Sequence, residues 1–426
     1  MPKLFRFLKS SPEKTVFFLL LLLFSFDVKS KGYDLDDLLS IAMVSYPEIV
    51  SRQQDLDAAD TDLTAAKLQF LPTISLSTQR NQVQYSANGP SSNNLPASNA
   101  TVTQPVFMGG KLLAGHDKAK ANFGVAEYSL IETRENVAKR MVTAYAEWRR
   151  SYEKIQALEH SVRIHEKLLN TIAKRHEMGV AAGIDKDLVM ARLNEAAAEL
   201  DAQKSAENDS LIAMSQLIGQ PVTRNNLTVK RTLPVKIQAR SQVLEKVING
   251  SPQIRRMQFE ADAAQAYADE IRSQTSPQVY LQAQRQVGNA YTPGWPAFNQ
   301  IGVVVQYSPG AGLSSYVSTS AANTKAQALR TKIESAKRDI AVQVNADVNE
   351  YETAQLKREK LTHSVTLTKK VSESYDRQYL VGKRSWLDLM NSVREEVQNM
   401  MAMADADASL LGSGYRIRTM LEAAGY

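Results

Sequence analysis

The side chains best placed to do chemistry in this sequence gather in one short segment, YLVGKRSWLD at residues 379–388. It brings a tyrosine, two cations and a carboxylate together between two long stretches that are compatible with helix. A tyrosine hydroxyl or a guanidinium that donates to a carboxylate contributes about 1.5 to 3 kcal/mol in favourable cases. The segment is therefore suited to a reversible link between helices.

Residues for metal or nucleophilic catalysis are sparse. The sequence has no cysteine, so we expect no disulfide, no thiol nucleophile and no lipid-anchored terminus. The five histidines form neither an HExxH pattern nor an i, i+4 pair with a carboxylate partner, and the Gly109-Gly110 pair lacks the rest of a phosphate-binding motif. We therefore predict no enzyme, cofactor or metal site and interpret the histidines as solvated. They are His116, His160, His165, His176 and His363.

The amino-terminal segment has the pattern of a secretory signal. Four cations precede an apolar run at residues 16–26, and this run is too short to span a bilayer as a stable anchor. We expect residues 1–30 to be a signal peptide, with an uncleaved anchor as the alternative. Because these residues carry five cations and two anions, their removal lowers the net charge from +6 to +3. The charge therefore gives no reason to expect a nucleic-acid partner.

The composition favours long helices. Apolar residues make up 43% of the chain, enough for a buried core, but aromatic residues only 7%. Alanine, glutamine, serine, glutamate, lysine and arginine fill the long middle segments. This composition is typical of coiled coils and not of compact α/β domains.

Short motifs recur in the same order in the two halves of the chain. YPEI is followed 205 residues later by SPQI, and LPTISL is followed 205 residues later by SPQVYL. Self-similarity at a fixed distance indicates a repeated structural unit. We therefore predict that the signal peptide is followed by two structural repeats, residues 31–230 and 231–426.

Each repeat has the same expected plan of a helix, a β-hairpin and a long helical hairpin. Apolar residues alternate with polar ones in the β-hairpins, as Val279, Leu281 and Ala283 alternate with glutamines, and this period of two is typical of strands. Turn-rich loops at 86–100 and 288–299 separate the paired strands. The first helices are expected at 47–71 and 252–275, the β-hairpins at 72–107 and 277–307, and the helical hairpins at 111–218 and 313–422.

The first helix of each helical hairpin is unusually long. A helix of about 68 residues extends roughly 100 Å, which no compact domain accommodates. Apolar residues in the second long helix follow steps of three and four, the pattern of antiparallel coiled-coil packing. The core stripe of an ordinary helical bundle is the alternative. The stripe consists of Leu329, Ile333, Ala336, Ile340, Val344, Val348 and Tyr351.

Four strands with one apolar and one polar face leave two arrangements open. They form a small sheet against a helix, or they contribute to a membrane β-barrel, whose backbone must be fully paired and closed. Four strands cannot close around a usable lumen, so the membrane arrangement requires several chains. Three chains give twelve strands, whereas two give eight, a barrel filled by side chains.

The order of these elements resembles the TolC family of outer-membrane channel proteins, which includes outer membrane efflux proteins and the outer-membrane components of type I secretion. The motifs that carry the resemblance are SYPEI and SPQI, FLPTISL and SPQVYL, TQPVFMGGK, and YLVGKRSWLDLMNSV. The match covers about residues 33–422. Each motif is loose by itself, and their order and double occurrence are specific.

The resemblance implies a mainly α-helical fold with a membrane β-barrel contribution. Four strands per protomer would complete a twelve-stranded barrel in the outer membrane of a Gram-negative type envelope, and antiparallel coiled-coil helices would form a tunnel in the periplasm. The implied partners of the homotrimer are outer-membrane lipid, a periplasmic adaptor (membrane fusion) protein and an inner-membrane ABC or proton-driven transporter. Such channels are passive conduits without chemistry of their own.

The cargo and one rival class of protein stay open at this point. The segments RHEMGVAAGIDKDL and LLGSGYRIRTMLEAAGY resemble channels that serve type I secretion of adhesins, and efflux of small molecules is the other cargo class. The rival is a periplasmic coiled-coil adaptor or structural rod without a pore. It would have long helices too, but it would not need two amphipathic β-hairpins.

The resemblance also assigns roles to the helix turns as the periplasmic tip. It places a tyrosine and an arginine that tie the second turn to the first at Tyr379 and Arg384. The acceptor in the first turn falls on Asp187, and because that turn is two residues longer than the family pattern, Asp185 competes for this role.

A ring of carboxylates around the channel axis is implied just above the second turn. The resemblance places it at Asp388, and a second family carboxylate falls on Asn391, so we expect one ring where relatives have two. Three carboxylates around a narrow axis favour cations, whereas the alternative is that Asp388 only caps a helix. The tip turns expected to contact the adaptor contain Gly179, Val180, Gly382 and Lys383.

Overall fold

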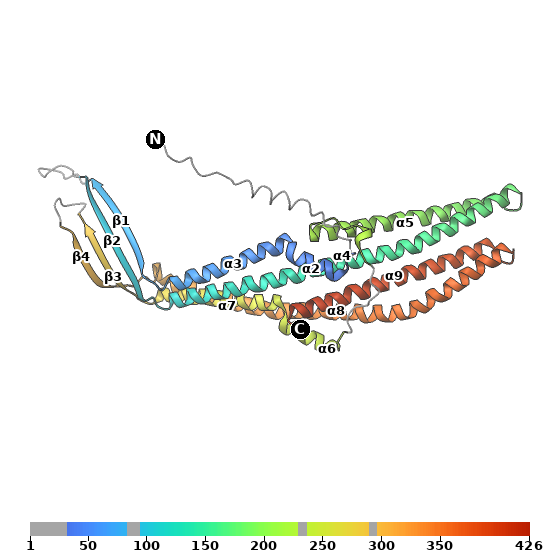
Figure 1. Ribbon diagram of the computed structural model, residues 1–426. Coiled ribbons are helices and arrows are strands. Elements are labelled where there is room, and N and C mark those ends of the chain that lie inside the picture. The colour runs from blue at the N-terminus through green and yellow to red at the C-terminus, as the bar shows by residue number, and fades with distance from the viewer. Residues whose placement is uncertain (1–31, 83–93, 229–236, 289–295) are drawn as a thin grey trace, which may run out of the picture.

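The computed structural model describes residues 32–82, 94–228, 237–288 and 296–426. Within them the molecule is elongated, with a β-sheet at one end and the turns of two helical hairpins at the other (Figure 1). The expected signal peptide lies outside the described residues.

Six long or medium α-helices and four strands carry the fold in the described part of the chain, with two further short α-helices. The medium and long helices are α3 (Pro47–Leu68), α4 (Lys111–Glu177), α5 (Gly183–Ile218), α7 (Pro252–Arg272), α8 (Ser314–Leu380) and α9 (Trp386–Ala423), and the short ones are α2 (Leu35–Ser45) and α6 (Arg240–Gly250). The strands are β1 (Thr73–Gln82), β2 (Asn94–Phe107), β3 (Gln278–Val287) and β4 (Phe298–Gln306). No helix among the described residues is both long and apolar enough to cross a membrane.

Prolines mark where several helices begin and end. Pro47 and Pro252 open α3 and α7 at a position whose N–H has no helical partner. The expected helix at 47–71 ends three residues early, at Leu68, because Leu71 precedes Pro72 and the residue before proline avoids helical backbone. The expected long helices are α4 and α8, each of 67 residues.

The sequence analysis did not predict two of the helices, α2 and α6, which occupy equivalent positions in the two halves of the chain. Both α2 and α6 have 11 residues, and each precedes a helix that begins with proline. A capping box opens α2, in which the Asp37 backbone N–H donates to Asp34 at 2.8 Å and the Asp34 N–H donates to Asp37 at 3.1 Å. Such a box before an apolar run was a readable helix signal.

The helices pack side by side in one layer (Figure 1). In the half near the hairpin turns, α5 packs on α4, α4 on α9, and α9 on α8. In the half near the sheet, α3 packs on α4, α4 on α7, and α7 on α8. The helix α4 is therefore internal along its whole length, whereas α8 lies at one edge and α3 and α5 lie at the other.

The strands form one antiparallel sheet in the order β1-β2-β3-β4. The expected loop at 86–100 is wrong at its end, because β2 already begins at Asn94 and pairs with β1 from there. The register between β2 and β3 shifts between Pro105 and Phe107, where proline lacks the N–H that a regular ladder needs.

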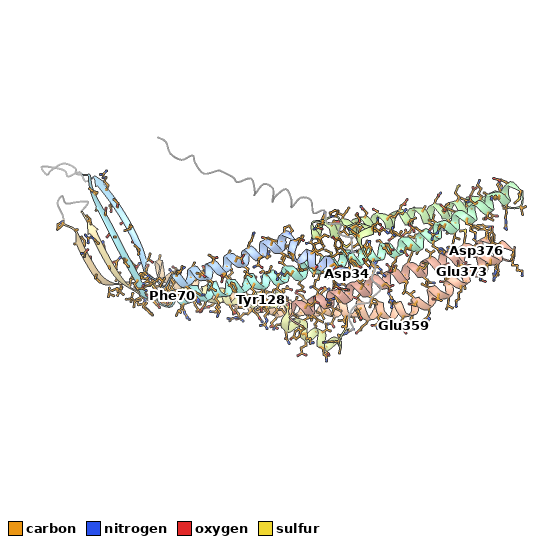
Figure 2. The ribbon with its side chains drawn as sticks, viewed as in Figure 1. Asp34, Phe70, Tyr128, Glu359, Glu373 and Asp376 are labelled. Atoms are coloured by element: carbon orange, nitrogen blue, oxygen red, sulfur yellow. The ribbon has the colours of Figure 1, made fainter. Side chains whose placement is uncertain are left out.

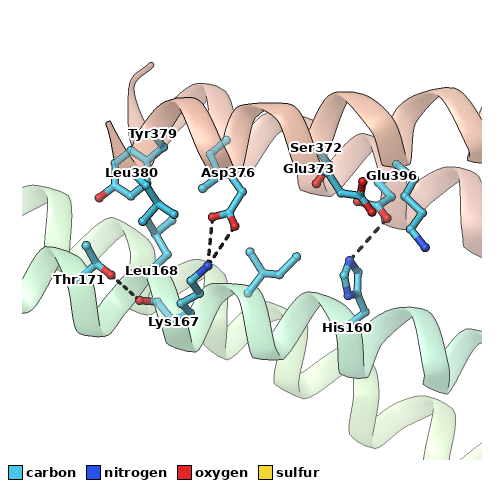
Figure 3. Close-up of a pocket in the computed structure, with 13 residues that line it drawn as sticks. His160, Lys167, Leu168, Thr171, Ser372, Glu373, Asp376, Tyr379, Leu380 and Glu396 are labelled. Atoms are coloured by element: carbon cyan, nitrogen blue, oxygen red, sulfur yellow. Dashed lines mark hydrogen bonds and ion pairs between the residues drawn. The ribbon is translucent and has the colours of Figure 1, made fainter. Parts of the chain in front are cut away.

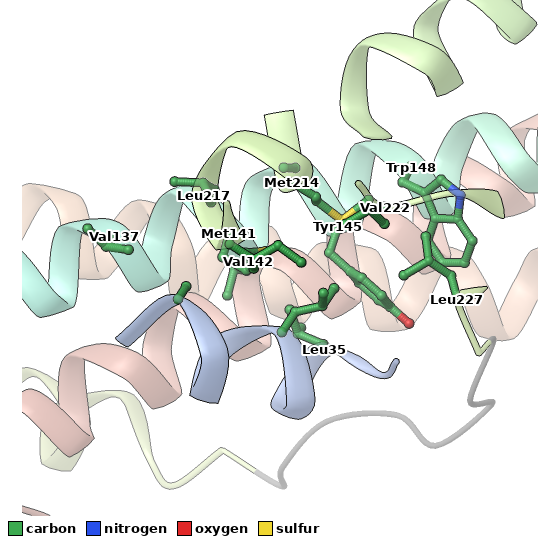
Figure 4. Packing of buried hydrophobic residues seen from close by; sticks show 14 of the residues in the cluster. Leu35, Val137, Met141, Val142, Tyr145, Trp148, Met214, Leu217, Val222 and Leu227 are labelled. Atoms are coloured by element: carbon green, nitrogen blue, oxygen red, sulfur yellow. The ribbon is translucent and has the colours of Figure 1, made fainter. Parts of the chain in front are cut away.

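The largest buried cluster lies at mid-length, where α2 and the end of α5 cover α4 (Figure 4). Trp148 is its largest fully buried side chain, with the Tyr145 ring centroid 5.2 Å away. A second cluster joins α4, α5, α8 and α9 near the hairpin turns. These clusters hold the layer together along its length.

The close approach of α4 and α7 requires glycine at position 124. A Cβ there would lie 2.6 Å from Cδ1 of Phe259, whose ring stacks on Tyr128 with centroids 5.6 Å apart. Gly115 on the same helix has open space where a Cβ would lie.

These two glycines give a matched pair of substitutions. Gly124→Ala should lower the free energy of unfolding by about 1 to 3 kcal/mol, because the ring must shift in a packed interface. Gly115→Ala should be neutral or raise it by up to about 1 kcal/mol, because alanine favours helix. Urea denaturation followed by circular dichroism measures both changes, and equal effects at the two positions would contradict the proposed tight contact.

Candidate functional site

The turns of the two helical hairpins are built alike. Gly179 and Gly382 both have φ of 74°, the left-handed conformation that ends many helices. The Val180 N–H donates to the Arg175 carbonyl at 2.8 Å, and the Lys383 N–H donates to the Gln378 carbonyl at 2.9 Å. These bonds close each long helix and reverse the chain.

The returning helices begin differently. Ser385 caps α9, and its hydroxyl accepts from the Asp388 N–H at 3.1 Å. Asp388 lies in the first turn of α9 and Asp185 in the first turn of α5, where a carboxylate favours the positive end of the helix dipole. The cap of α9 is therefore Ser385, and at this helix end the Asp388 carboxylate is favoured only by the helix dipole.

Tyr379 joins the two hairpins, but not through the expected partner. Its side chain is 3% exposed, and the Arg175 guanidinium of α4 lies over the ring at 4.9 Å from its centroid. Burial raises the pKa of the Tyr379 phenol, against the opposing charge of Arg175. The hydroxyl is buried without a hydrogen-bond partner among the described residues, which costs about 1 to 3 kcal/mol.

Within one chain, Arg384 bonds only to its own hairpin among the described residues. Its guanidinium lies 3.9 Å from Asp388, 3.4 Å from the Gln378 amide oxygen, and over the Tyr375 ring at 4.6 Å. The ion pair is exposed, so it contributes about 0 to 1 kcal/mol.

The structure of one chain does not bring either predicted donor to the first turn. Asp185 is half-buried and Asp187 is exposed, and neither meets Tyr379 or Arg384 in the described part of the chain. The pairing of Tyr379 and Arg384 with Asp187 or Asp185 stays a prediction. Asn391 is exposed and accepts from Arg394 at 3.1 Å, so a ring formed with Asp388 is likewise a matter of several chains.

A pocket of about 200 Å³ lies between the hairpins just above Tyr379 (Figure 3). Lys167 of α4 reaches Asp376 of α8 at 3.0 Å, and His160 of α4 lies 3.5 Å from Glu396 of α9. Figure 2 shows Asp376 near the hairpin turns, at the opposite end of the molecule from Phe70. Together with Arg175 and Tyr379, these pairs make three links between the hairpins.

Sequence reasoning missed these links and misjudged one histidine. His165 is buried, not solvated, and its Nδ1 lies 2.8 Å from the Ser161 carbonyl oxygen. The position of Arg175, four residues before Gly179, was a usable signal, because Tyr379 lies three residues before Gly382. Residues at equal distances from the two turns lie level with each other.

Glu396 is the most deeply buried carboxylate of this site, with 2% exposure. Burial raises its pKa, but contacts with His160 and Ser372 lower it more, so the net direction is down. No group of three or more potential metal ligands occurs in the residues that the structure describes. The two ion pairs and the Arg175–Tyr379 contact join the helices of the two hairpins by charge and packing.

The lowered pKa of Glu396 predicts a stability change with pH. Because its folded-state pKa lies below the unfolded-state value, the carboxylate stabilises the fold above the ordinary glutamate pKa, and this stabilisation is lost as the pH falls through the lowered value. Urea midpoints of wild type and Glu396→Gln should therefore converge between about pH 7 and about pH 3. Glu373→Gln, an exposed carboxylate of the same pocket, serves as the control, and a constant gap between wild type and Glu396→Gln would contradict the assignment.

Comparison with known proteins identifies the fold. The crystal structure of the outer membrane protein VceC from Vibrio cholerae matches with a TM-score of 0.78 at 16% identity, covering 92% of this chain and 96% of that one. A membrane protein from Pseudomonas aeruginosa matches with a TM-score of 0.80 at 14% identity, covering 92% and 91%. The CmeC outer membrane channel of Campylobacter jejuni matches with a TM-score of 0.77 at 14% identity, covering 93% and 87%.

The sequence comparisons agree with this fold. No curated protein matches the chain significantly. The family model described as outer membrane efflux protein matches residues 38–220, which include β1, β2 and the first helical hairpin. The expected fold class and the expectation of a transport protein rather than an enzyme are thereby confirmed. The chain therefore has the fold of TolC-like outer membrane channels, and its first half is similar to the outer membrane efflux protein family.

Proposed function

We propose that the chain forms a homotrimeric channel in the outer membrane, the passive exit duct of a tripartite export system. Its helical layer would form a tunnel in the periplasm. A periplasmic adaptor and an inner-membrane ABC or proton-driven transporter would open its tip. The observation that carries this proposal is the sheet, whose apolar face and two edges have no cover within the described part of one chain.

The register of the sheet places side chains of one character together in two neighbouring central rows. Ile74 pairs with Val102, Val102 with Ala283, and Ala283 with Ile301. The next row joins Ser75, Thr101, Gln284 and Gln300. Successive rows point to opposite faces of a sheet, so one face is apolar and the other polar.

The apolar face is exposed in a single chain. Ile74 is 72% exposed and Ile301 78% exposed, and water disfavours such a contiguous apolar surface. Lipid on this face and a polar lumen on the other would suit both rows. The edge strands β1 and β4 would then pair between copies, and three copies would supply twelve strands.

The rival interpretation, a periplasmic rod or adaptor without a pore, has no use for this sheet. Long antiparallel helices suit a rod as well as a tunnel. An exposed amphipathic sheet with free edges invites aggregation in a soluble rod, whereas a membrane channel needs it.

The proposal includes two repeats and a cargo class. Repeats at 31–230 and 231–426 are supported by the equal lengths of α4 and α8, of β1 and β3, and of α2 and α6. The family match favours efflux of small molecules, and the names of the structural neighbours, which include the open state of the MtrE outer membrane channel of Neisseria gonorrhoeae, agree with a channel. Type I secretion of adhesin-like proteins rests on the motif resemblance alone.

Within this proposal the tip is a gate. Tyr379 and Arg384 would bond Asp185 or Asp187 of the first turn, and the buried Tyr379 hydroxyl gains most from such an acceptor because it has no partner in one described chain. Gly179, Val180, Gly382 and Lys383 would form the surface that the adaptor meets. The ring would consist of Asp388, with Asn391 behind it.

The gate predicts a change in conductance. Purified wild type in a planar bilayer should show a small conductance, and Tyr379→Phe with Arg384→Ser should raise it about tenfold or more, because three copies of a link of about 1 kcal/mol or more are lost. Arg377→Ser, which removes an exposed cation from the last turn of α8, is the matched control. If neither wild type nor the double variant conducts, the channel proposal fails and the rod interpretation takes its place.

The carboxylate ring predicts ion selectivity. Wild type should prefer cations over anions, and Asp388→Asn should reduce this preference at least severalfold, because three charges leave the narrowest part of the pore. Reversal potentials in a salt gradient measure the preference. Unchanged selectivity in Asp388→Asn, with Glu395→Gln as the exposed control on the same helix, would leave Asp388 with its role at the helix dipole alone.

A further inference from the structure

A groove lies over α4 near the hairpin turns, between α5 and α9. The three helices run side by side there in the order α5, α4, α9 (Figure 1). Within the described residues, α5 and α9 do not pack on each other beyond marginal contact, so part of the α4 surface between them is open. The groove has a volume of about 350 Å³, which suits a small organic molecule.

One polar side chain from each helix lies at the same level of this groove. His165 lies 12 residues before the end of α4, Glu195 lies 12 residues after the start of α5, and Gln398 lies 12 residues after the start of α9. At about 1.5 Å per residue, all three lie roughly 18 Å from the hairpin turns. All three line the groove, so one molecule in it can meet a histidine, a carboxylate and an amide together.

His165 offers a hydrogen-bond acceptor to the groove. Its side chain is 7% exposed, and its Nδ1 lies 2.8 Å from the Ser161 carbonyl oxygen. A carbonyl can only accept, so Nδ1 carries the hydrogen and Nε2 keeps its lone pair in the uncharged ring. Within the described residues, the hydrogen-bond contacts of the ring involve Nδ1 and none involves Nε2. A buried acceptor without a partner is uncommon in proteins, and this one borders an open groove.

The floor of the groove is apolar and contains two thioethers. Leu158 of α4 is buried there, as are Met390 and Val397 of α9. Met401 of α9 is half-buried in the same groove. Burial of an apolar molecule on this floor is favourable, and methionine sulfur makes favourable contacts with aromatic rings. The floor therefore favours an aromatic body.

The charges on the rim of the groove balance. Arg192 and Glu195 pair with each other within α5 at 2.7 Å. Arg394 of α9 and Glu199 of α5 add one further charge of each sign. With two cations and two carboxylates, the rim gives no net preference for a charged molecule. A neutral molecule also avoids the cost of taking a charge out of water.

We propose that this groove binds a neutral aromatic molecule that carries one hydroxyl or N–H donor, such as a phenol. The ring lies on the methionines of the floor, and the donor bonds to Nε2 of His165. A site that bonds one hydroxyl discriminates against analogues without it, because its acceptor is then left without a partner. The inference goes beyond the proposed channel, because every residue that lines the groove belongs to one chain.

Isothermal titration calorimetry with two matched probes tests the donor. Naphthol carries a hydroxyl, whereas its methyl ether has the same rings and no donor. The full chain in phospholipid nanodiscs should bind naphthol about tenfold more tightly than the ether near neutral pH, after subtraction of the heat from empty nanodiscs. Equal dissociation constants for the two probes would overturn the proposal.

His165→Phe tests the acceptor. Without the imidazole, naphthol and its methyl ether should bind within about twofold of each other, because the lost hydrogen bond is what separated them. His363→Phe replaces an exposed histidine of α8 outside the groove, so it should keep the preference for naphthol and serves as the matched control. A preference that persists in His165→Phe would overturn the role of His165.

A second variant makes the test independent of whether His165→Phe folds. Ala196 of α5 lines the groove, and Ala196→Phe should weaken the binding of naphthol about tenfold or more, because the new ring occupies the space. Ala198→Phe is the control, since residue 198 lies about 200° round the same helix and is exposed outside the groove. Unchanged binding in Ala196→Phe would overturn the location of the site.

Naphthoate tests the charge of the ligand. It has the same rings with a carboxylate in place of the hydroxyl, and it should bind at least severalfold more weakly than naphthol, because the rim has no net charge to compensate it. Tighter binding of naphthoate would show that Arg394 selects an anion and would overturn the neutral class. Conductance tests the channel separately, so a failure of the groove proposal leaves the proposed function standing.

Discussion

The burial of α4 is the constraint on which the rest of the molecule depends. A helix of 67 residues has no stability of its own that could hold a straight rod of this length in water, so its stability must come from packing. Four helices supply that packing, α3 and α7 near the sheet and α5 and α9 near the turns. The change of partners at mid-length coincides with the largest buried cluster, around Trp148. The second long helix, α8, packs on α7, α9 and the short α6, and among the described residues no long helix follows it on its outer side.

One principle therefore governs both ends of the molecule. The sheet leaves β1 and β4 as edges, and the layer leaves α8 and the line of α3 and α5 as edges. In the described part of one chain, the inner strands and helices have neighbours on both sides, whereas the edge strands and edge helices have a neighbour on one side. In the proposed trimer, copies of the chain would cover these edges, and the function would then reside in the space that the copies enclose.

Features set by local chemistry were predictable from the sequence. Alternating residues located the strands, steps of three and four located the coiled coil, and Pro47, Pro252, Gly179 and Gly382 marked where helices begin and end. The partners of Tyr379 and the pairs that join His160 to Glu396 and Lys167 to Asp376 were not, because they depend on which helix faces meet. The burial of His165 could not be predicted from the sequence for the same reason. Composition shows that a residue can be solvated, but only packing decides whether it is.

The equal lengths of α4 and α8 restrict how this sequence can change. Each long helix runs from the sheet to a turn, and the links around Tyr379 require the two turns to stand level. An insertion of one heptad in α4 alone would carry its turn about 10 Å beyond the other and separate Arg175 from Tyr379. Length variants can therefore arise only through matched insertions or deletions in both helical hairpins, on the outgoing and the returning helix alike. The length of the helical part can therefore change only as a whole, although four separate helices, α4, α5, α8 and α9, determine it.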